Sequence, residues 1–185
     1  MFTLKQGLLM LALFGMLLPS VALAQDADKK QIMDIENDFA KNATNGPGAG
    51  AVMKKYLYDG KVLQLTGSGR IGMMQKATVV EVFSKPDPSD PGVKTTMTLS
   101  GMEVELYGDT AIATYKMANT DSGHKDPVLN STEHYGCMDT FVKREGKWLN
   151  VANACAHEGP VSPAVWEAIK KARASEPKEV QQAYH

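Results

Sequence analysis

The sequence lacks a second long apolar run, a cluster of lysines and arginines, and any cysteine other than Cys137 and Cys155. Because there is no second long apolar run, we predict no stable membrane insertion once the N-terminal apolar segment is removed. The absence of a Lys and Arg cluster argues against a nucleic-acid surface, because such surfaces gather Lys and Arg, whereas this chain has a formal net charge of −1. We see no internal repeat and no low-complexity tract.

The N-terminus has the pattern of an export signal. Lys5 provides the positive charge, residues 8–18 are apolar, and Pro19 breaks the run. Ala22-Leu23-Ala24 then gives the small-x-small pattern that precedes cleavage. The run is shorter than the ~20 residues of a membrane span, so removal is favoured over an uncleaved anchor. We expect a signal peptide over residues 1–24, cleaved after Ala24, and a periplasmic or secreted mature protein.

The rest of the chain has the length of one domain with a single core. We predict this domain over residues 25–160 and a C-terminal helix and tail over 161–185. Helices first and antiparallel strands afterwards indicate an α+β fold, in which helices cover one side of a curved sheet. Period-3.6 patterns predict helices over 28–43, 49–60, 74–85 and 162–174; alternation predicts strands over 61–67, 93–108, 110–119 and within 134–159; residues 84–92 read as a loop.

The last hairpin turns within "KREGKW". A two-residue turn would place Glu145 at positive φ, which is unfavourable for a residue other than Gly, Asn or Asp. We therefore expect a three-residue loop, Arg144-Glu145-Gly146, with Lys143 opposite Lys147. In that register Cys137 faces Asn153 and Cys155 is a diagonal neighbour, ~7–8 Å away.

This register sorts the hairpin into two faces. One face holds His134, Met138, Thr140 and Val142 opposite Trp148, Asn150, Ala152, Ala154 and Ala156, and its run of alanines suits close packing on a helix or another subunit. The other combines apolar bulk with polar groups, as a ligand pocket requires. It holds Glu133, Tyr135, Cys137, Asp139 and Phe141 opposite Leu149, Val151, Asn153, Cys155 and His157.

We expect the ligand-binding residues to come from this second face, with one addition from the region before the first strand. They are Tyr135, Asp139, Phe141, Val151, Asn153, His157 and Asp59. The register keeps Asp139 and His157 more than ~10 Å apart, so they form no dyad, and His157 reaches Glu133 or Tyr135 instead. Two alternatives stay open: Asp139 as a structural carboxylate bonded to loop amides, and His157 as a solvent-exposed strand-end residue.

The two cysteines favour a disulfide, because an exported protein meets an oxidising compartment. The diagonal placement is slightly beyond easy reach, so two buried thiols remain the alternative. We predict no metal site, since His134, His157 and Glu133 lack the close grouping of zinc ligands, and we expect no cofactor.

Several segments carry a resemblance to a known superfamily. "MDTFVKREGKWLNVAN" resembles the final hairpin of nuclear transport factor 2-like proteins, above all the domain-of-unknown-function 4440 branch and the ketosteroid isomerase and polyketide cyclase-like branch. "VELYGDTAIATYKM" is similar to the preceding hairpin, "QKATVVEVF" to the third helix and "IENDFAKN" to the first. The resemblance covers roughly residues 28–157. It implies a cone-shaped curved sheet around N-terminal helices, a pocket at the wide end, and frequent homodimers.

The resemblance also implies a role for Asp139, which matches an Asp of the superfamily. Gly136 stands where many members have Arg, and Ala154 lies near where relatives often carry His. The superfamily includes isomerases, dehydratases, cyclases, hydrolases and binding modules, so the fold does not give the function. We expect the helix after Pro160 to cap the pocket or the dimer seam.

Three functions fit these observations. The favoured one is an exported module that binds a small, partly apolar molecule. The second is an isomerase or lyase, in which Asp139 takes a proton beside a carbonyl while Tyr135 or His157 stabilises the developing charge. The third is a dimeric assembly or partner-binding module.

Overall fold

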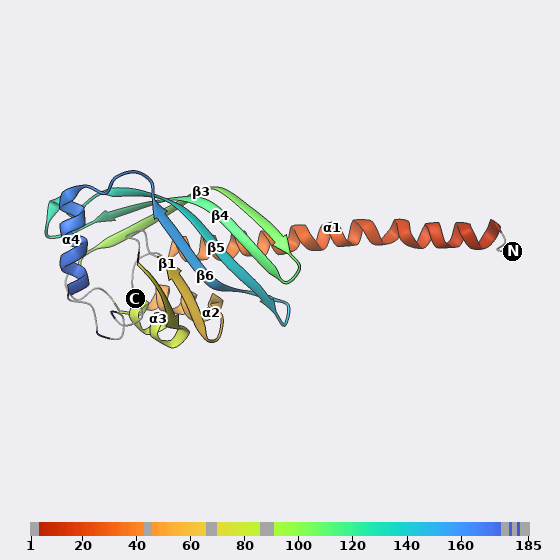
Figure 1. The fold of residues 1–185 in the computed structure, drawn as a ribbon, viewed down its shortest axis with the longest axis horizontal. Coiled ribbons are helices and arrows are strands. Elements are labelled where there is room, and N and C mark those ends of the chain that lie inside the picture. The colour runs from red at the N-terminus through yellow and green to blue at the C-terminus, as the bar shows by residue number, and fades with distance from the viewer. Residues whose placement is uncertain are drawn as a thin grey trace.

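The computed structural model describes residues 4–42, 46–65, 70–85, 91–174, 178 and 181. Figure 1 shows a curved sheet beside its helices, with the start of α1 projecting away from one end and α4 lying at the other. Among the residues described, no helix is long and apolar enough to cross a membrane. The elements are α1 (Leu4–Lys41), α2 (Pro47–Tyr56), β1 (Lys61–Leu65), β2 (Ile71–Gln75), α3 (Lys76–Phe83), β3 (Lys94–Tyr107), β4 (Thr110–Ser122), η1 (Pro127–Leu129), β5 (Thr132–Arg144), β6 (Lys147–His157) and α4 (Pro163–Ala174).

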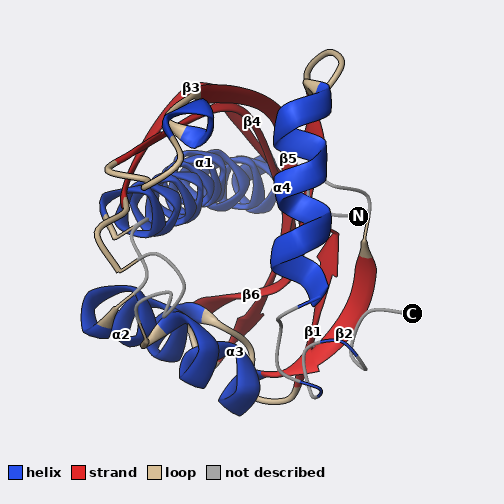
Figure 2. Ribbon diagram, turned by 90° about the vertical axis from the view of Figure 1, so that its left-hand side faces the viewer, coloured by secondary structure: helices blue, strands red, loops and turns tan. Residues whose placement is uncertain are grey.

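The sheet has six strands in the order β2-β1-β6-β5-β4-β3. Its concave side wraps around α1, while α2 and α3 lie beside the β1 end (Figure 2). This is the predicted α+β architecture. The sheet is mixed, however, because β1 runs parallel to β6, with Leu63 opposite Ala152.

The predicted helices agree with the structure except near β2 and at the end of α2: the predicted helix over 49–60 ends at Tyr56, because Leu57 forms a bridge with Asn150. The predicted helix over 74–85 begins only at Lys76, because Met74 pairs with Val62 in an antiparallel ladder and is 4% exposed. The predicted helix over 28–43 is the second half of the longer α1. Residues 43, 66–67 and 86–90 of the predicted elements lie outside the described residues.

The core lies between α1 and the concave face of the sheet. Ile32 and Ile35 present one side of α1 to the strands and are 0% and 2% exposed. They pack against buried side chains of β3 to β6, namely Val104, Ala111, Ala113, Phe141 and Trp148. A second cluster joins α3 to β1 and β2 through Leu57, Val62, Met74 and Val79.

The turn between β5 and β6 differs from the prediction. Arg144 pairs with Lys147, so the loop has two residues, and both Glu145 and Gly146 take positive φ, 52° and 75°. The predicted three-residue loop is therefore wrong. A two-residue turn of this kind matches the twist of the flanking strands, and that match outweighs the local strain at Glu145.

A β-bulge then shifts the register of the same hairpin. Phe141 pairs with Asn150, but the preceding Thr140 pairs with Ala152, so Val151 is the extra residue in β6. Beyond the bulge Cys137 lies directly opposite Cys155 rather than Asn153. Before it, Trp148 and Asn150 turn toward the core and are 1% and 2% exposed, whereas the predicted register places them on the opposite face.

The strained turn yields a stability prediction. Glu145→Asn should raise the free energy of unfolding by about 1 kcal/mol, because Asn tolerates the left-handed conformation that costs most residues roughly that much. Urea denaturation measures the change.

The matched control for this substitution is Asp109→Asn. Asp109 follows Gly108 in the other tight turn and has no positive φ. Its substitution should change stability by less than about 0.5 kcal/mol. Equal effects in the two turns would contradict the two-residue turn at Glu145.

Candidate functional site

A buried carboxyl group comes from the apolar side of α1. Glu36 lies one turn after Ile32 and is only 2% exposed. Residues four apart share one face of a helix, so Glu36 must point where the core residues point. Its side chain therefore faces the concave side of the sheet.

A second buried carboxyl group and a phenol meet Glu36 from the sheet. Asp139 of β5 is 3% exposed and Tyr115 of β4 is 8% exposed, and they are diagonal neighbours because Tyr115 pairs with Cys137. The two carboxyl groups and the Tyr115 hydroxyl are close enough to shift one another's pKa through charge and hydrogen bonding. Three elements distant in sequence thus converge at one point.

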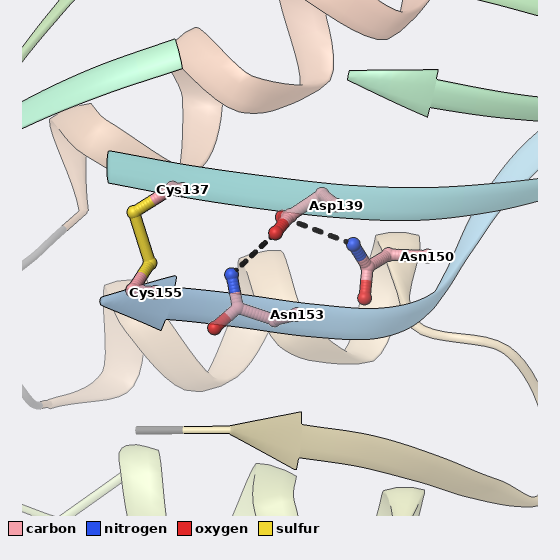
Figure 3. Close-up of a disulfide and its surroundings, with 5 residues drawn as sticks. All are labelled: Cys137, Asp139, Asn150, Asn153 and Cys155. Atoms are coloured by element: carbon pink, nitrogen blue, oxygen red, sulfur yellow. Dashed lines mark hydrogen bonds between the residues drawn. A yellow bond between two sulfur atoms is a disulfide. The ribbon is translucent and has the colours of Figure 1, made fainter. Parts of the chain in front are cut away.

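Two amides of β6 hold Asp139 from the other side. Asn150 Nδ2 donates to Asp139 Oδ2 at 3.1 Å, and Asn153 Nδ2 donates to Oδ1 at 2.5 Å (Figure 3). Residues three apart in a regular strand point to opposite faces. The bulge at Val151 is what brings both amides to the same carboxyl group.

Burial determines which groups of this cluster are protonated. Loss of solvent raises the pKa of Glu36 well above its usual range, and the charge of Asp139 raises it further. Burial also raises the pKa of Asp139, to about 7, although hydrogen bonds from Glu36, Asn153, Tyr115 and Asn150 oppose that rise. Burial likewise raises the pKa of Tyr115, so its hydroxyl stays protonated. Near neutral pH, Glu36 is therefore the proton donor of the carboxyl pair and Asp139 the acceptor.

The cluster borders a cavity of about 190 Å³. Glu36 and Asn150 line this cavity, and each has one buried side-chain oxygen, Oε1 and Oδ1, without a hydrogen-bond partner among the described residues. Among the described residues that line the cavity there is no Lys, Arg or His. The described lining consists of Glu36, Phe39, Asn42, Met53, Leu57, Gln64, Val79, Phe83, Met97, Tyr115, Met117, Asp139, Asn150, Asn153 and Cys155.

Cys137 and Cys155 form a disulfide at one edge of the cavity (Figure 3). The predicted bridge is present, for a reason that the predicted register did not supply: the bulge places the two cysteines directly opposite each other. Tyr115 packs against both. The bridge therefore fixes β5 to β6 beside the residues that hold Asp139.

Tyr135 and His157 form a different cluster from Asp139. They pair across β5 and β6 with their rings edge to face at 4.9 Å, and His157 Nε2 lies 2.6 Å from Glu133 Oε2. Asp139 pairs with Asn153 instead, so the expectation that it cannot meet His157 directly holds. Neither Tyr135 nor His157 belongs to the cavity lining.

The remaining predicted ligand residues have different surroundings. Asn153 and Asp139 line the cavity. Phe141 is 0% exposed and belongs to the core under α1, and Val151 is the bulged residue. Asp59 is an exposed partner of Lys76, with 2.7 Å between Oδ1 and Nζ.

Sequence reasoning missed Glu36, Tyr115 and Asn150. Glu36 had a detectable signal, because it interrupts the apolar face formed by Ile32, Ile35 and Phe39. The only sequence signal for Tyr115 was the strand alternation that places it on the same face as Ala111 and Ala113. Asn150 had none, since its inward position depends on the bulge.

The outer face of the sheet is more open. A hollow of about 540 Å³ lies over the middle strands, where Gly136, Ala154 and Ala156 leave the surface low, and Met138 beside them is 45% exposed. The described residues include no group of three or more His, Cys, Asp or Glu that could hold a metal ion.

Solved structures match this arrangement of elements. A nuclear transport factor 2-like superfamily protein from Salmonella enterica aligns with a TM-score of 0.60 at 13% identity, over 75% of this chain and 96% of its own. This chain has the nuclear transport factor 2-like fold. At such identities the likeness concerns the fold alone, and the sequence matches no protein-family model and no curated protein at a significant level.

Other proteins with the nuclear transport factor 2-like fold differ in what they are said to do. A dehydratase candidate from Streptomyces avermitilis aligns with a TM-score of 0.57 at 12% identity, over 74% of this chain and 99% of its own. The CaMKII hub of S. rosetta aligns with a TM-score of 0.53 at 18% identity, over 70% and 96%. The fold itself therefore leaves the function to be argued from the cavity.

The carboxyl pair predicts a particular dependence of stability on pH. The folded pKa values of Glu36 and Asp139 are raised, so the folded protein keeps protons that the unfolded chain releases. Their contribution to stability is complete below the unfolded values and is lost as the pH rises through the folded values, which for Asp139 is about 7. Urea denaturation at constant ionic strength should show stability falling between pH 5 and pH 8.

The double variant Glu36→Gln/Asp139→Asn should flatten that pH dependence, because it removes both ionisable groups at nearly constant volume. Glu103→Gln, an exposed carboxylate on β3, is the matched control and should keep the wild-type slope. An unchanged slope in the double variant would show that the pair titrates normally.

Proposed function

We propose that this protein is an exported binding module that takes up a small, partly apolar molecule in the cavity beside Glu36 and Asp139. The supporting observation is the pair of buried oxygens, Glu36 Oε1 and Asn150 Oδ1, that lack partners among the described residues at the cavity. A buried polar group without a hydrogen bond costs about 1–3 kcal/mol. A ligand with donor groups removes that cost, which gives binding a specific driving force.

The rest of the cavity suits an apolar part of the same ligand. Met53, Val79 and Phe83 come from α2 and α3, and Phe39 comes from α1. An apolar cavity of about 150 Å³ holds benzene. A cavity of about 190 Å³ therefore suits a ring or short chain that carries one polar head.

Export is the second part of the proposal. The predicted signal peptide ends at Ala24, and the hydrogen bonds that tie α1 to the β5–β6 hairpin lie beyond it. Asp28 accepts from Lys143 Nζ at 2.7 Å and from Trp148 Nε1 at 3.0 Å. Removal of residues 1–24 thus leaves these contacts of α1 in place. The Cys137–Cys155 disulfide is of the kind that persists in the periplasm or outside the cell.

The third part of the proposal is that the protein forms a homodimer. The outer face of the sheet has small side chains at Gly136, Ala154 and Ala156 beside the exposed Met138. Small residues allow close approach of a second sheet, and Met adapts to irregular surfaces. The assembly named for the CaMKII hub is a property of that protein and serves only as a precedent for association in this fold.

Native mass spectrometry of the exported protein tests the proposal. We expect a mature chain that starts at Gln25, a dimer, and an adduct of small mass. Met53→Trp should fill the cavity and remove the adduct, because Met53 lines it, whereas Met138→Trp on the outer face should retain it. A chain without an adduct, or one whose adduct survives Met53→Trp, would contradict binding in this cavity.

A second candidate function is an isomerase or lyase that uses Asp139 as general base. The observation that favours it is the pKa of about 7 for Asp139, which suits a base that works near neutral pH. Tyr115 takes the part that the sequence alone assigns to Tyr135 or His157, because its protonated hydroxyl lies beside the carboxyl pair and Tyr115 lines the cavity. The dehydratase candidate with this fold gives a precedent of class only.

Proton exchange tests this second candidate. Cyclohexanone in deuterated buffer should lose its α-protons faster with the protein than without it, because a base beside a donor removes a proton next to a carbonyl. Nuclear magnetic resonance measures the rate. Asp139→Asn should abolish the acceleration and His157→Ala should not; no acceleration by the wild-type protein would rule out this chemistry for ketones of that size.

A further inference from the structure

The charges around the cavity have one sign. Glu36 from α1 and Asp139 from β5 are the ionisable carboxyl groups of the described lining, and Tyr115 from β4 stays protonated. The helices α2 and α3 contribute uncharged side chains, such as Met53, Val79 and Phe83. An anionic ligand would meet like charge in a site shielded from water, where repulsion is strong. Anions are therefore excluded as the main ligands.

The unpartnered atoms at the cavity are acceptors. Glu36 and Asn150 are each 2% exposed, and Glu36 Oε1 and Asn150 Oδ1 lack donors among the described residues. Figure 3 shows the side-chain oxygen of Asn150 turned away from Asp139, while its nitrogen donates to that carboxyl group. A ligand that pairs both oxygens must therefore supply at least two hydrogen-bond donors.

The choice among donors follows from charge and size. A hydroxyl has one proton to donate, so it leaves one of the two oxygens unpaired. A primary ammonium has three donors and a positive charge, which balances the negative charge of the pair. A quaternary ammonium has no donor. Phe39, Phe83 and Tyr115 also line the cavity, and aromatic rings attract cations.

We propose that the ligand of this cavity is a small primary amine, bound as its ammonium ion against Glu36 and Asn150 with its hydrocarbon part on the wall formed by α2 and α3. This inference rests on the proposed binding function and deepens it by naming the chemical class. It also fixes a pH dependence: a cation binds best to ionised Asp139, so affinity rises as the pH increases through about 7.

Isothermal titration calorimetry with three probes of equal shape tests the inference: benzylamine, benzyl alcohol and benzoate. Benzylamine is protonated at pH 5.5 and at pH 8. At pH 8 it should bind at least tenfold more tightly than benzyl alcohol, and benzoate should bind more weakly than both. The benzylamine affinity should fall at least threefold at pH 5.5, while the benzyl alcohol affinity should stay within twofold.

Two variants test whether the negative charge of Asp139 causes the preference for the amine. Asp139→Asn removes the ionised member of the pair and should abolish the preference for benzylamine over benzyl alcohol. Glu103→Gln removes an exposed carboxylate of β3 that does not belong to the cavity lining, so it should retain the preference within threefold. Circular dichroism checks that each variant is folded; if Asp139→Asn is not, the order of the three probes and its pH dependence in the wild-type protein decide.

The outcomes distinguish this inference from the proposed function. If benzyl alcohol binds as tightly as benzylamine, or if benzoate binds best, the amine assignment falls and the binding cavity stands. A preference that survives Asp139→Asn also overturns the assignment. If none of the three probes binds, and toluene does not stabilise the protein in a thermal melt, the amine assignment and the binding function both fall.

Discussion

The β-bulge at Val151 is the constraint on which the rest of the site depends. Without it, Asn150 and Asn153 would point to opposite faces of β6, and only one could reach Asp139. With it, both amides stabilise one buried carboxylate. The same extra residue brings Cys137 opposite Cys155 and turns Trp148 into the core. A single irregularity in one strand thus sets the hydrogen bonds, the disulfide and the packing of the hairpin.

The hairpin also determines where α1 lies. Trp148 and Lys143, on the turn side of the bulge, bind Asp28 near the start of the packed part of α1. Eight residues later the same helix delivers Glu36 to Asp139, on the other side of the bulge. The helix is therefore held to the hairpin at a half-buried ion pair and at a buried carboxyl pair. An unpaired buried charge would be strongly destabilising, and the shared proton keeps the net charge of this pair low.

The sequence was sufficient for the fold class, though not for β2, because most of its patterns are local. Alternation identified the long strands, and the apolar face of residues 28–43 identified the helix that packs on them. Asp139 could be selected because a strand that faces the core rarely carries an acid. The failures were non-local. The residue type of Glu145 disfavours the turn in which it lies. Asn150 reaches the cavity only because of the bulge. The partner of Glu36 comes from a strand about a hundred residues away in the sequence.

Glu36 and Asp139 share one proton at the edge of the cavity, and the proposed function depends on this pair. Carbon-13 nuclear magnetic resonance of the side-chain carboxyl groups, followed as a function of pH, measures this most directly. The structure predicts that Asp139 titrates near pH 7 and that Glu36 stays protonated to a higher pH than an ordinary glutamic acid. If both carboxyl carbons titrate near their unperturbed values of about 4, the two groups are solvated, they share no proton, and the claim is wrong.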